Sequence, residues 1–404
     1  MAIDVYPLLE AALYTLIVIS IVALIAGYTR IPYTVALVFA GLLLSHARRF
    51  PVLRISPEVF MTLVLPPLIF EAAFHIDIDD FKRDADAIMS YAFIGTLLSA
   101  ALTGLFAYFL LGFSFLEALL LGVIVSPTDP VAVIAIFRRL GIPGRLSLII
   151  EGESLFNDGV VIVSYSAIVT ALLTGIFGLM GVVWRITYAV IGGMIIGGLL
   201  GYVVYKIIHL VDDRFVEILL TFISAYGIYL IAESFDASGI IAVAVGGLII
   251  SNYGVRLGMT SEARGILHTQ WEFVAFLANS VAFIFIGMYL KLQLLLTELW
   301  IVSLSIGGIL ATRAAMVYLV SRALKLRKKV IPTNWQHVIA WSGLRGAISI
   351  VLILGLTALP IQHAERIMAI TFGVVLFSIL VQGLSLSTLI QRLGLVTNRE
   401  ERPP

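Results

Sequence analysis

Residues 116–137 read LEALLLGVIVSPTDPVAVIAIF, an apolar stretch long enough to cross a bilayer, with an aspartate and two prolines at its centre. Pro130 has no backbone N–H and disfavours helical geometry at Asp129, while Pro127 weakens the turn before it. We expect the helix to unwind around Thr128 and Asp129 and to free backbone carbonyl oxygens there. Carbonyl oxygens beside a carboxylate suit a hard cation. Asp129 can also cap the half-helix that follows it.

The whole chain has the composition of a protein that crosses a membrane many times. Of its 404 residues, 60% are hydrophobic and 13% are charged, which is more apolar surface than a soluble protein of this size can hide. The formal net charge of +1 gives no bulk attraction to nucleic acid. The absence of cysteine excludes disulfides, thiolate catalysis and cysteine metal sites. We find no phosphate-binding glycine loop, so we expect neither a nucleotide partner nor ATP hydrolysis.

Runs of about 20 apolar residues, separated by charged or Pro/Gly-rich segments, predict an all-α polytopic membrane protein with a single membrane domain. We expect 13 transmembrane helices, of which the second and ninth are short and the third is interrupted by Pro66 and Pro67. Their approximate bounds are 8–27, 32–46, 57–76, 86–111, 115–139, 146–174, 182–210, 215–234, 238–252, 267–291, 298–322, 335–357 and 364–391.

The distribution of Lys and Arg predicts how these spans are oriented. Of the 26 basic residues, 18 fall on the side opposite the N-terminus, 6 fall on the N-terminal side, and Arg313 and Arg345 fall inside spans. We call the richer side the basic side, and the positive-inside rule places it in the cytoplasm. We therefore expect a multi-pass protein of the cell membrane, with the N-terminus outside and residues 393–404 as a short cytoplasmic tail.

A second interrupted span matches the first. The sequence SGLRG at 342–346 breaks the twelfth span as the prolines break the fifth, and the two breaks lie seven spans apart. Six-span units 1–6 and 8–13, joined by span 7, would then run in opposite directions through the membrane. This predicts two inverted six-helix repeats with interrupted helices 5 and 12 crossing at mid-membrane, as in secondary transporters. The simpler alternative is that Gly and Pro are common in membrane helices.

Acidic residues in the middle of spans need an explanation, because a charge at the bilayer centre costs roughly 3 kcal/mol. Asp158 follows Ser154 by four residues in span 6, so both side chains lie on one face of the helix. With Asp129 and Thr128 they form a candidate site for a small cation or a proton. Asn157 points away from that face and can bond the unwound stretch of span 5. The alternative is a polar network that only holds spans 5 and 6 together.

The other intramembrane charges suggest supporting roles. Glu153 needs a cationic partner, and the arginines within spans are Arg313 and Arg345, so we expect a structural cluster of these three residues. Arg345 can also complement the carbonyl ends of the broken helices. Glu71, near the basic end of span 3, either lines a cytoplasmic access route that attracts cations or is solvated at the interface.

The residues alone leave several kinds of protein open. Two inverted, interrupted helices favour a transporter, whereas in a cation channel the acidic residues would form a selectivity site. A sodium-coupled carrier of an organic solute would need additional groups for the solute, and we find none beyond the ion ligands. An intramembrane protease would hold its two aspartates together as a dyad, without ligands such as Ser154 and Asn157.

Four motifs, in order, resemble the sodium/proton antiporters of the NhaP/NHE branch of the monovalent cation:proton antiporters. They are LPPLIFEAAFHID (65–77), SPTDPVAV (126–133), EGESLFNDG (151–159) and WSGLRGAISI (341–350), and the resemblance extends over about residues 20–392. It implies 13 helices, an inverted repeat and a homodimer. It also implies a dimerisation part, a linking helix and an ion-translocating core. The dimerisation part would be residues 1–84 and 215–291, and the linking helix would be residues 182–210. The ion-translocating core would be residues 85–174 and 298–392.

The resemblance also implies roles for single residues. The ion would bind to Asp129, Asp158, Ser154 and the backbone of Thr128. Asn157 would be the asparagine of the branch's Asn-Asp pair, Glu153 with Arg345 the structural ion pair, and Glu71 the acid near the cytoplasmic access. Because Asn157 replaces a second aspartate of electrogenic relatives, the resemblance implies exchange of one Na⁺, Li⁺ or K⁺ for one proton, without a cofactor. Competition of both ions for one site would couple the two flows.

Overall fold

The computed structural model describes residues 5–28, 32–46, 57–211, 213–259, 261–357 and 359–396. Outside these ranges lie residues 397–404 of the expected tail and six arginines that were counted toward the orientation: Arg30, Arg48, Arg49, Arg54, Arg399 and Arg402.

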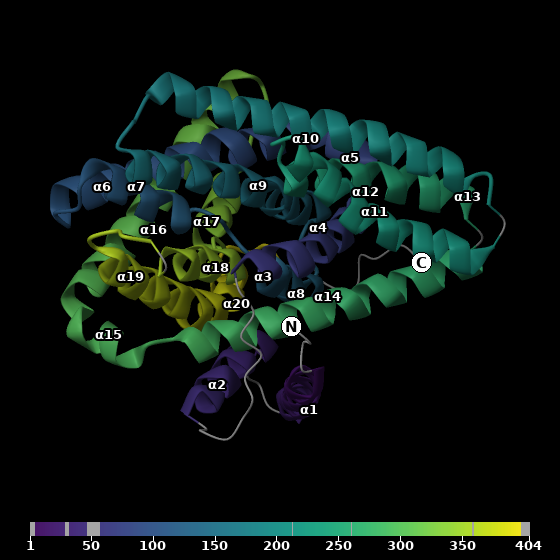
Figure 1. Cartoon of the computed structure of the whole chain (residues 1–404). Helices are drawn as coiled ribbons and strands as arrows, with labels where there is room; N and C mark the ends of the chain where they lie inside the picture. The colour runs from purple at the N-terminus through teal and green to yellow at the C-terminus, as the bar shows by residue number, and fades with distance from the viewer. Residues whose placement is uncertain are drawn as a thin grey trace.

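Every regular element in the described part is a helix (Figure 1). The first half contains α1 (Val5–Tyr28), α2 (Tyr33–His46), α3 (Pro57–Leu63), α4 (Leu65–Phe74), α5 (Ile78–Met89), the π-helix η1 (Ser90–Gly95), α6 (Thr96–Leu110), α7 (Phe115–Ile124), α8 (Val131–Leu140) and α9 (Gly144–Thr174). The rest contains α10 (Leu179–Ile208), α11 (Arg214–Ser234), α12 (Gly239–Ile249), the π-helix η2 (Ile250–Val255), α13 (Arg256–Gly258), α14 (Ser261–Tyr289), α15 (Leu292–Thr297), α16 (Leu299–Leu326), α17 (Thr333–Trp341), α18 (Ala347–Leu356), α19 (Ala364–Phe377), the π-helix η3 (Ser378–Gln382) and α20 (Gly383–Arg392).

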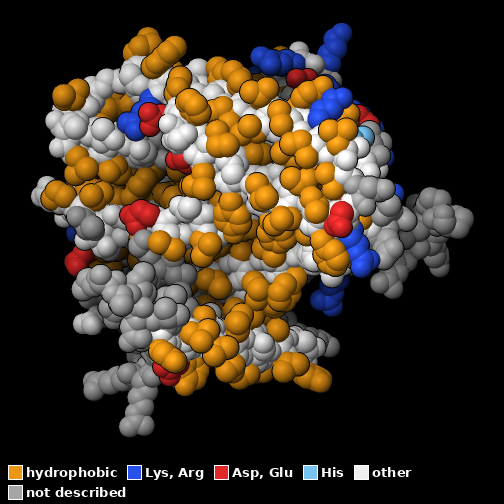
Figure 2. Space-filling model, turned by 45° about the vertical axis from the view of Figure 1, so that its right-hand side comes forward, with side chains coloured by type: hydrophobic (Ala, Val, Ile, Leu, Met, Phe, Trp, Pro, Cys, Tyr) orange, Lys and Arg blue, Asp and Glu red, His pale blue; other side chains and the backbone are white. Residues whose placement is uncertain are grey.

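The outer surface of this bundle suits a bilayer. In the described part of the chain, nine helical runs are long and apolar enough to cross a membrane, and four more apolar helices have 10–17 residues. Hydrophobic side chains cover much of the face in Figure 2, while Lys and Arg gather mainly on its right-hand part. Along α10, Ile191, Ile195 and Leu199 are each more than half exposed, which fits contact with lipid rather than water. The predicted all-helical polytopic membrane fold is therefore confirmed.

The predicted start of the fourth span is wrong by about two turns. Helix α5 begins at Ile78 rather than near residue 86, because the Asp77 carboxylate accepts the N–H groups of Asp79 (2.8 Å) and Asp80 (3.2 Å) and caps it. Lys82 consequently lies in a helix and not in a loop. The sequence also did not predict the short helix α15.

Both interrupted spans are confirmed as pairs of short helices separated by non-helical backbone. Residues 126–130 separate α7 from α8, and residues 343–346 separate α17 from α18. The two breaks touch, since the backbone N–H of Asp129 donates to the carbonyl of Leu344 at 2.7 Å. Gly346 allows this approach, because a Cβ at that position would lie 2.5 Å from the Asp129 Cβ. The unwound stretches thus meet inside the bundle and position the site.

Candidate ion-binding site

The break between α7 and α8 is stabilised from two directions. One oxygen of the Asp129 carboxylate accepts the N–H of Val131 at 2.9 Å, so Asp129 caps the first turn of α8 as predicted. Arg345 enters from the other break, and its guanidinium donates to the carbonyls of Ser126 (2.6 Å) and Pro127 (3.2 Å). The prediction that Arg345 complements freed carbonyl oxygens is therefore confirmed.

A buried hydrogen-bond network connects the break to α9. The Asn157 amide donates to the Thr128 hydroxyl at 2.8 Å, the Thr128 and Ser154 hydroxyls lie 3.1 Å apart, and Ser154 donates to the Thr128 carbonyl at 2.7 Å. Thr128, Ser154 and Asn157 are all buried. The predicted bond from Asn157 to the unwound stretch is therefore confirmed, while the buried Oδ1 of Asn157 has no hydrogen-bond partner among the described residues. The network also holds spans 5 and 6 together, as the structural alternative proposed.

A cavity of about 550 Å³ lies beside this network. Thr128, Asp129, Ser154 and Asp158 all line it, so the structure brings together the four residues that the sequence assigned to the ion. Among the described residues, none donates a hydrogen bond to the Asp158 carboxylate. An ionised carboxylate in the middle of a membrane domain is costly without a donor, a proton or a cation.

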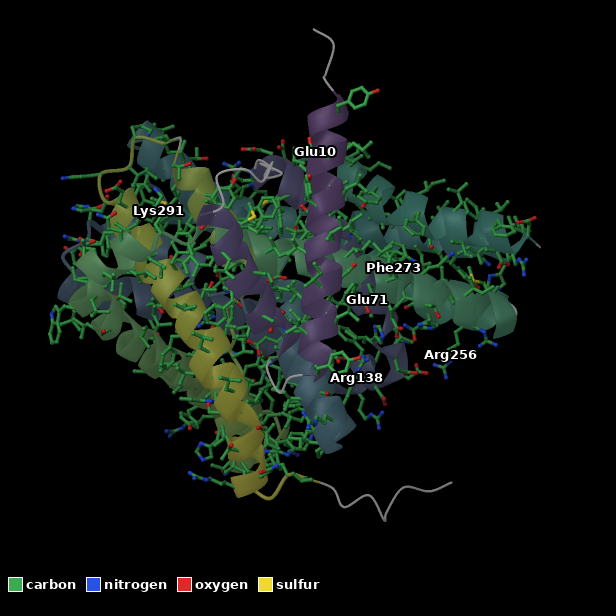
Figure 3. The ribbon with its side chains drawn as sticks, turned by 90° about the horizontal axis from the view of Figure 1, so that it is seen from below. Glu10, Glu71, Arg138, Arg256, Phe273 and Lys291 are labelled. Carbon is green, nitrogen blue, oxygen red and sulfur yellow. The ribbon has the colours of Figure 1, made fainter. Side chains whose placement is uncertain are left out.

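The cavity extends to the basic end of α4. Glu71 lines it, which favours the access role over a purely interfacial one, and Figure 3 shows Glu71 and Arg138 in the same region of the molecule. His75 Nδ1 lies 3.2 Å from Glu71 Oε1, and His75 Nε2 lies 3.9 Å from Glu272 Oε1. Charged side chains from α4, α8 and α14 therefore surround this end of the cavity.

Sequence reasoning missed several residues of this wall. Glu151 lines the cavity and precedes Asp158 by seven residues, so both occupy one face of α9 together with Ser154. That spacing was visible in the sequence and could have identified Glu151. Glu272 and Asn279 also line the cavity, but from α14, where no local motif marks them.

The buried ion pair differs from the one that the family resemblance implied. Glu153 Oε1 lies 2.6 Å from Arg313 Nη1, with side chains only 2% and 5% exposed, and Arg313 also donates to the Ile339 carbonyl at 3.3 Å. Arg345 is not the ion-pair partner of Glu153. The physical reason is that the guanidinium of Arg345 is engaged by the carbonyls of the interrupted span.

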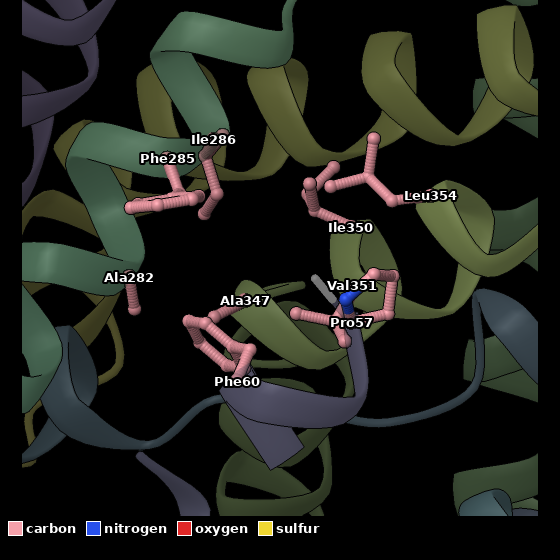
Figure 4. Close-up of a pocket in the computed structure, with 9 residues that line it drawn as sticks. All are labelled: Pro57, Phe60, Ala282, Phe285, Ile286, Ala347, Ile350, Val351 and Leu354. Atoms are coloured by element: carbon pink, nitrogen blue, oxygen red, sulfur yellow. The ribbon is translucent and has the colours of Figure 1, made fainter. Parts of the chain in front are cut away.

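An apolar layer adjoins the site at Ala347. Side chains of α3, α14 and α18 surround a space of only about 10 Å³, at the limit for one water molecule (Figure 4). Its lining residues are Pro57, Phe60, Ala282, Phe285, Ile286, Ala347, Ile350, Val351 and Leu354. Ala347 lines both this space and the large cavity, so the apolar layer begins where the site ends.

The arrangement offers two carboxylates with hydroxyl and carbonyl oxygens. The described residues contain no cluster of three or more His, Asp or Glu side chains placed to hold a metal ion. The oxygens of Asp129, Asp158, Ser154 and Thr128 are the ligand type that a hard monovalent cation would share with Ca²⁺ or Mg²⁺. Chemically, the site is suited to bind and release a cation or a proton.

Comparisons with known proteins find relatives that are described as sodium/proton exchangers or antiporters. Residues 15–392 match the family model described as sodium/hydrogen exchanger, transmembrane. The Na⁺/H⁺ antiporter ApNhaP of Aphanothece halophytica is 37% identical over 378 residues, which cover 93% of this chain and 72% of the relative. The Na⁺/H⁺ antiporter NhaH of Halobacillus aidingensis is 34% identical, with 96% and 98% covered. The solved structure of the sodium proton antiporter MjNhaP1 from Methanocaldococcus jannaschii has a TM-score of 0.78 at 23% identity, covers 96% of this chain and 99% of that one, and shows the same fold.

Proposed function

The chain belongs to the sodium/hydrogen exchanger family, and we propose that it exchanges one Na⁺, Li⁺ or K⁺ for one proton at a single site between its two interrupted spans. It is a multi-pass sodium/proton antiporter of the NhaP type and not an enzyme. The observation that carries the proposed site is the Asp158 carboxylate, which faces the cavity beside Asp129 without a hydrogen-bond donor among the described residues. Such a group requires a proton or a cation to become neutral.

The transported ion binds to the oxygens of Asp158, Asp129, Ser154 and Thr128. These residues line one cavity and come from two segments joined by short hydrogen bonds. Asn157 and Arg345 support the site, since they hold the Thr128 hydroxyl and the carbonyls before it. Because the two loads compete for one carboxylate, the half-saturating Na⁺ concentration should rise about tenfold per pH unit of acidification over the pH range in which the Na⁺-free site is mostly protonated.

The charges around the site support a stoichiometry of one for one. Arg313 and Arg345 are buried cations, while Glu153, Asp129 and Asp158 supply three negative charges. Counted over these five residues, apart from Glu71, Arg138, Glu151 and Glu272 of the same cavity, the empty site carries one uncompensated negative charge, and either Na⁺ or a proton cancels it. A neutral site can cross an apolar barrier, whereas a charged one cannot, and this difference couples the two flows.

Alternating access follows from the two ends of the site. The cavity reaches Glu71 and Arg138, and we propose that the apolar layer of Figure 4, which adjoins the site at Ala347, closes the opposite end. With the basic side in the cytoplasm, this conformation faces inward and the N-terminus lies outside. Residues 85–174 and 298–392 form the core that moves against 1–84 and 215–291, with 182–210 as the linking helix. A homodimer in the plasma membrane, formed through the second part, completes the proposal.

The helix inventory supports the expected topology. The nine long runs and four shorter apolar helices add to thirteen segments that follow the predicted spans in order. The breaks at residues 126–130 and 343–346 meet through the bond between Asp129 and Leu344. We propose that they are corresponding parts of two inverted repeats that cross at mid-membrane.

Proton flux in proteoliposomes tests the site. Asp158→Asn should abolish Na⁺-driven proton flux, because the neutral amide cannot exchange a proton for a cation. Asp86→Asn is the matched control, since its side chain is 58% exposed, and it should leave the flux unchanged. Normal exchange by Asp158→Asn would rule out the proposed site.

Clamping the membrane potential tests the stoichiometry. A 1:1 exchanger should show the same rate with the potential clamped and unclamped. A potential-dependent rate would contradict the proposed charge balance. Passive cation flux without proton coupling would instead indicate a channel.

A further inference from the structure

The connection between α4 and α5 is held in place by one buried side chain, Asn252 of η2. We propose that Asn252 is a positioning residue for transport, which fixes one end of this connection on the stationary part so that the core turns about a defined joint. The inference rests on the proposed movement of the core. It assigns the joint to residues that neither the ion site nor the apolar layer uses.

Asn252 bonds the backbone on both sides of Asp77. Its side-chain oxygen accepts the N–H of Ile78 at 3.0 Å, and its amide donates to the Ile76 carbonyl at 2.9 Å. The same amide donates to the Leu248 carbonyl at 3.0 Å, within its own helix. The side chain is therefore fully engaged where one helix ends and the next begins, and it is only 8% exposed as a residue.

Two neighbours of Asn252 bind the same connection. Arg256 forms an ion pair with Asp77 at 2.6 Å, and the Lys82 ammonium donates to the Tyr253 hydroxyl at 3.0 Å. Figure 3 shows Arg256 at the far side of the molecule from Lys291, in keeping with the position of α13 in Figure 1. Asn252 and Tyr253 lie in a π-helix, an element that often occurs at functional positions.

The element that carries Asn252 is itself firmly packed on the proposed stationary part and on the linking helix. Ser251 donates to the Ala73 carbonyl at the end of α4 at 3.4 Å. Gly254 sits against α10, where an added Cβ would lie 3.2 Å from Ile208 and 3.7 Å from Tyr205. The anchor therefore connects the first turn of α5 to α4, α10 and η2 together.

Helix α5 changes partners within its first two turns. From Phe81 onward α5 also contacts the proposed core: Phe81 packs on Phe156 of α9 with ring centroids 5.9 Å apart, and Asp84 pairs with Arg145 of α9 at 2.8 Å. The change from one part to the other thus falls between Ile78 and Asp84. A rigid-body turn of the core must be absorbed by the backbone of these residues, and Asn252 holds its stationary end.

If Asn252 only capped a helix, its loss would lower the stability of the protein. If Asn252 anchors a joint, its loss lowers the rate of transport. Loss of the anchor should slow the turnover of the core without changing the ion ligands, which lie elsewhere in the structure. If these hydrogen bonds stabilise the transition state between the two conformations by about 1.4 kcal/mol, their loss slows the movement of the core about tenfold.

The test compares Asn252→Ala, Asn252→Asp and Thr221→Val in proteoliposomes. Thr221 is the matched control, because it is fully buried and its hydroxyl accepts a bond from Trp271 at 3.1 Å, which joins α11 to α14 and not the connection between α4 and α5. We expect Asn252→Ala to lower the maximal exchange rate about tenfold with an unchanged half-saturating Na⁺ concentration. Asn252→Asp keeps the acceptor for Ile78 and should be intermediate. Should the alanine variant not fold, the aspartate variant carries the comparison.

Hydrogen exchange checks that the anchor is lost at the joint itself, while the exchange rate at matched thermal stability reports the transport role. Backbone amides of residues 75–82 should exchange faster in Asn252→Ala than in Thr221→Val at matched thermal stability. A wild-type rate for Asn252→Ala, or an equal loss of rate in Thr221→Val, would overturn the inference. Asp158→Asn, measured in the same kind of vesicles, separates the two proposals. An active Asp158→Asn variant would overturn the proposed ion site. Normal rates of the Asn252 variants beside an inactive Asp158→Asn variant would overturn the joint alone.

Discussion

Gly346 allows the two interrupted spans to approach each other, and Gly346→Ala tests whether their contact sets the affinity for the ion. The backbone torsions of Gly346, φ −119° and ψ −155°, are accessible to alanine, so the substitution introduces no backbone strain. An added methyl group would, however, lie 2.5 Å from the Cβ of Asp129. To reach an ordinary contact of about 3.5 Å, the Asp129 side chain must move by about 1 Å.

This displacement sets the expected magnitude. We take the ion–oxygen distance as about 2.4 Å, as for a cation of the size of Ca²⁺. Lengthening it to about 3.4 Å at an effective dielectric constant of about 20 weakens the Coulomb attraction by about 2 kcal/mol. A loss of that size raises the half-saturating Na⁺ concentration about 30-fold. The maximal rate should change less, because Asp158 still carries the exchanged load.

The assay is Na⁺-driven proton flux in proteoliposomes over a range of Na⁺ concentrations. Gly307→Ala in α16 is the control, since an added Cβ there has no neighbour within 4 Å, and it should match the wild type. An unchanged half-saturating concentration in Gly346→Ala would refute the reasoning, because the position of Asp129 would then not matter for binding. A folded variant with no Na⁺ binding at all would mean that Asp129 contributes more than a Coulomb estimate allows.

Two further predictions follow from the buried pair and from the two ends of the site. Glu153→Leu alone should cost about 3–5 kcal/mol of stability because it leaves Arg313 buried without its partner, whereas the double variant with Arg313→Met should cost much less; thermal unfolding in detergent measures both. Since the chain has no cysteine, Asn279→Cys should react with an impermeant thiol reagent from the basic side, while Val351→Cys in the apolar layer should be protected. Equal labelling of both would contradict the proposed inward-facing state.

The local chemistry of the site was predictable because it depends on short-range rules. Two prolines around Asp129 force an unwound stretch, and a spacing of four residues places Ser154 and Asp158 on one helix face. Both effects are confined to a few residues of sequence, and the structure contains both. The bond from Asn157 to Thr128 also followed, because an unwound stretch next to an amide side chain must satisfy its polar groups.

Long-range pairings could not be derived in the same way. Glu153 had two possible partners, Arg313 and Arg345, and it pairs with Arg313. Arg345 instead binds the carbonyls of Ser126 and Pro127. This contact joins segments far apart in the sequence, so no local pattern predicts it. Glu272 reaches the cavity only because α14 packs beside α4. The start of α5 was misplaced for a simpler reason, since its charged first turns were taken as a loop although Asp77 caps them.

The two aspartates of the site are not equivalent, and their surroundings explain why. Asp129 is held by its own break: its carboxylate accepts the N–H of Val131, its backbone N–H donates to Leu344, and Gly346 lies against its side chain. Asp158 has no such donor among the described residues, so its charge is the one that a load must neutralise. Asp129 therefore shapes the site and Asp158 exchanges the load. This assignment implies that a longer side chain is tolerated better at 158, which faces the open cavity, than at 129, where Gly346 leaves no room.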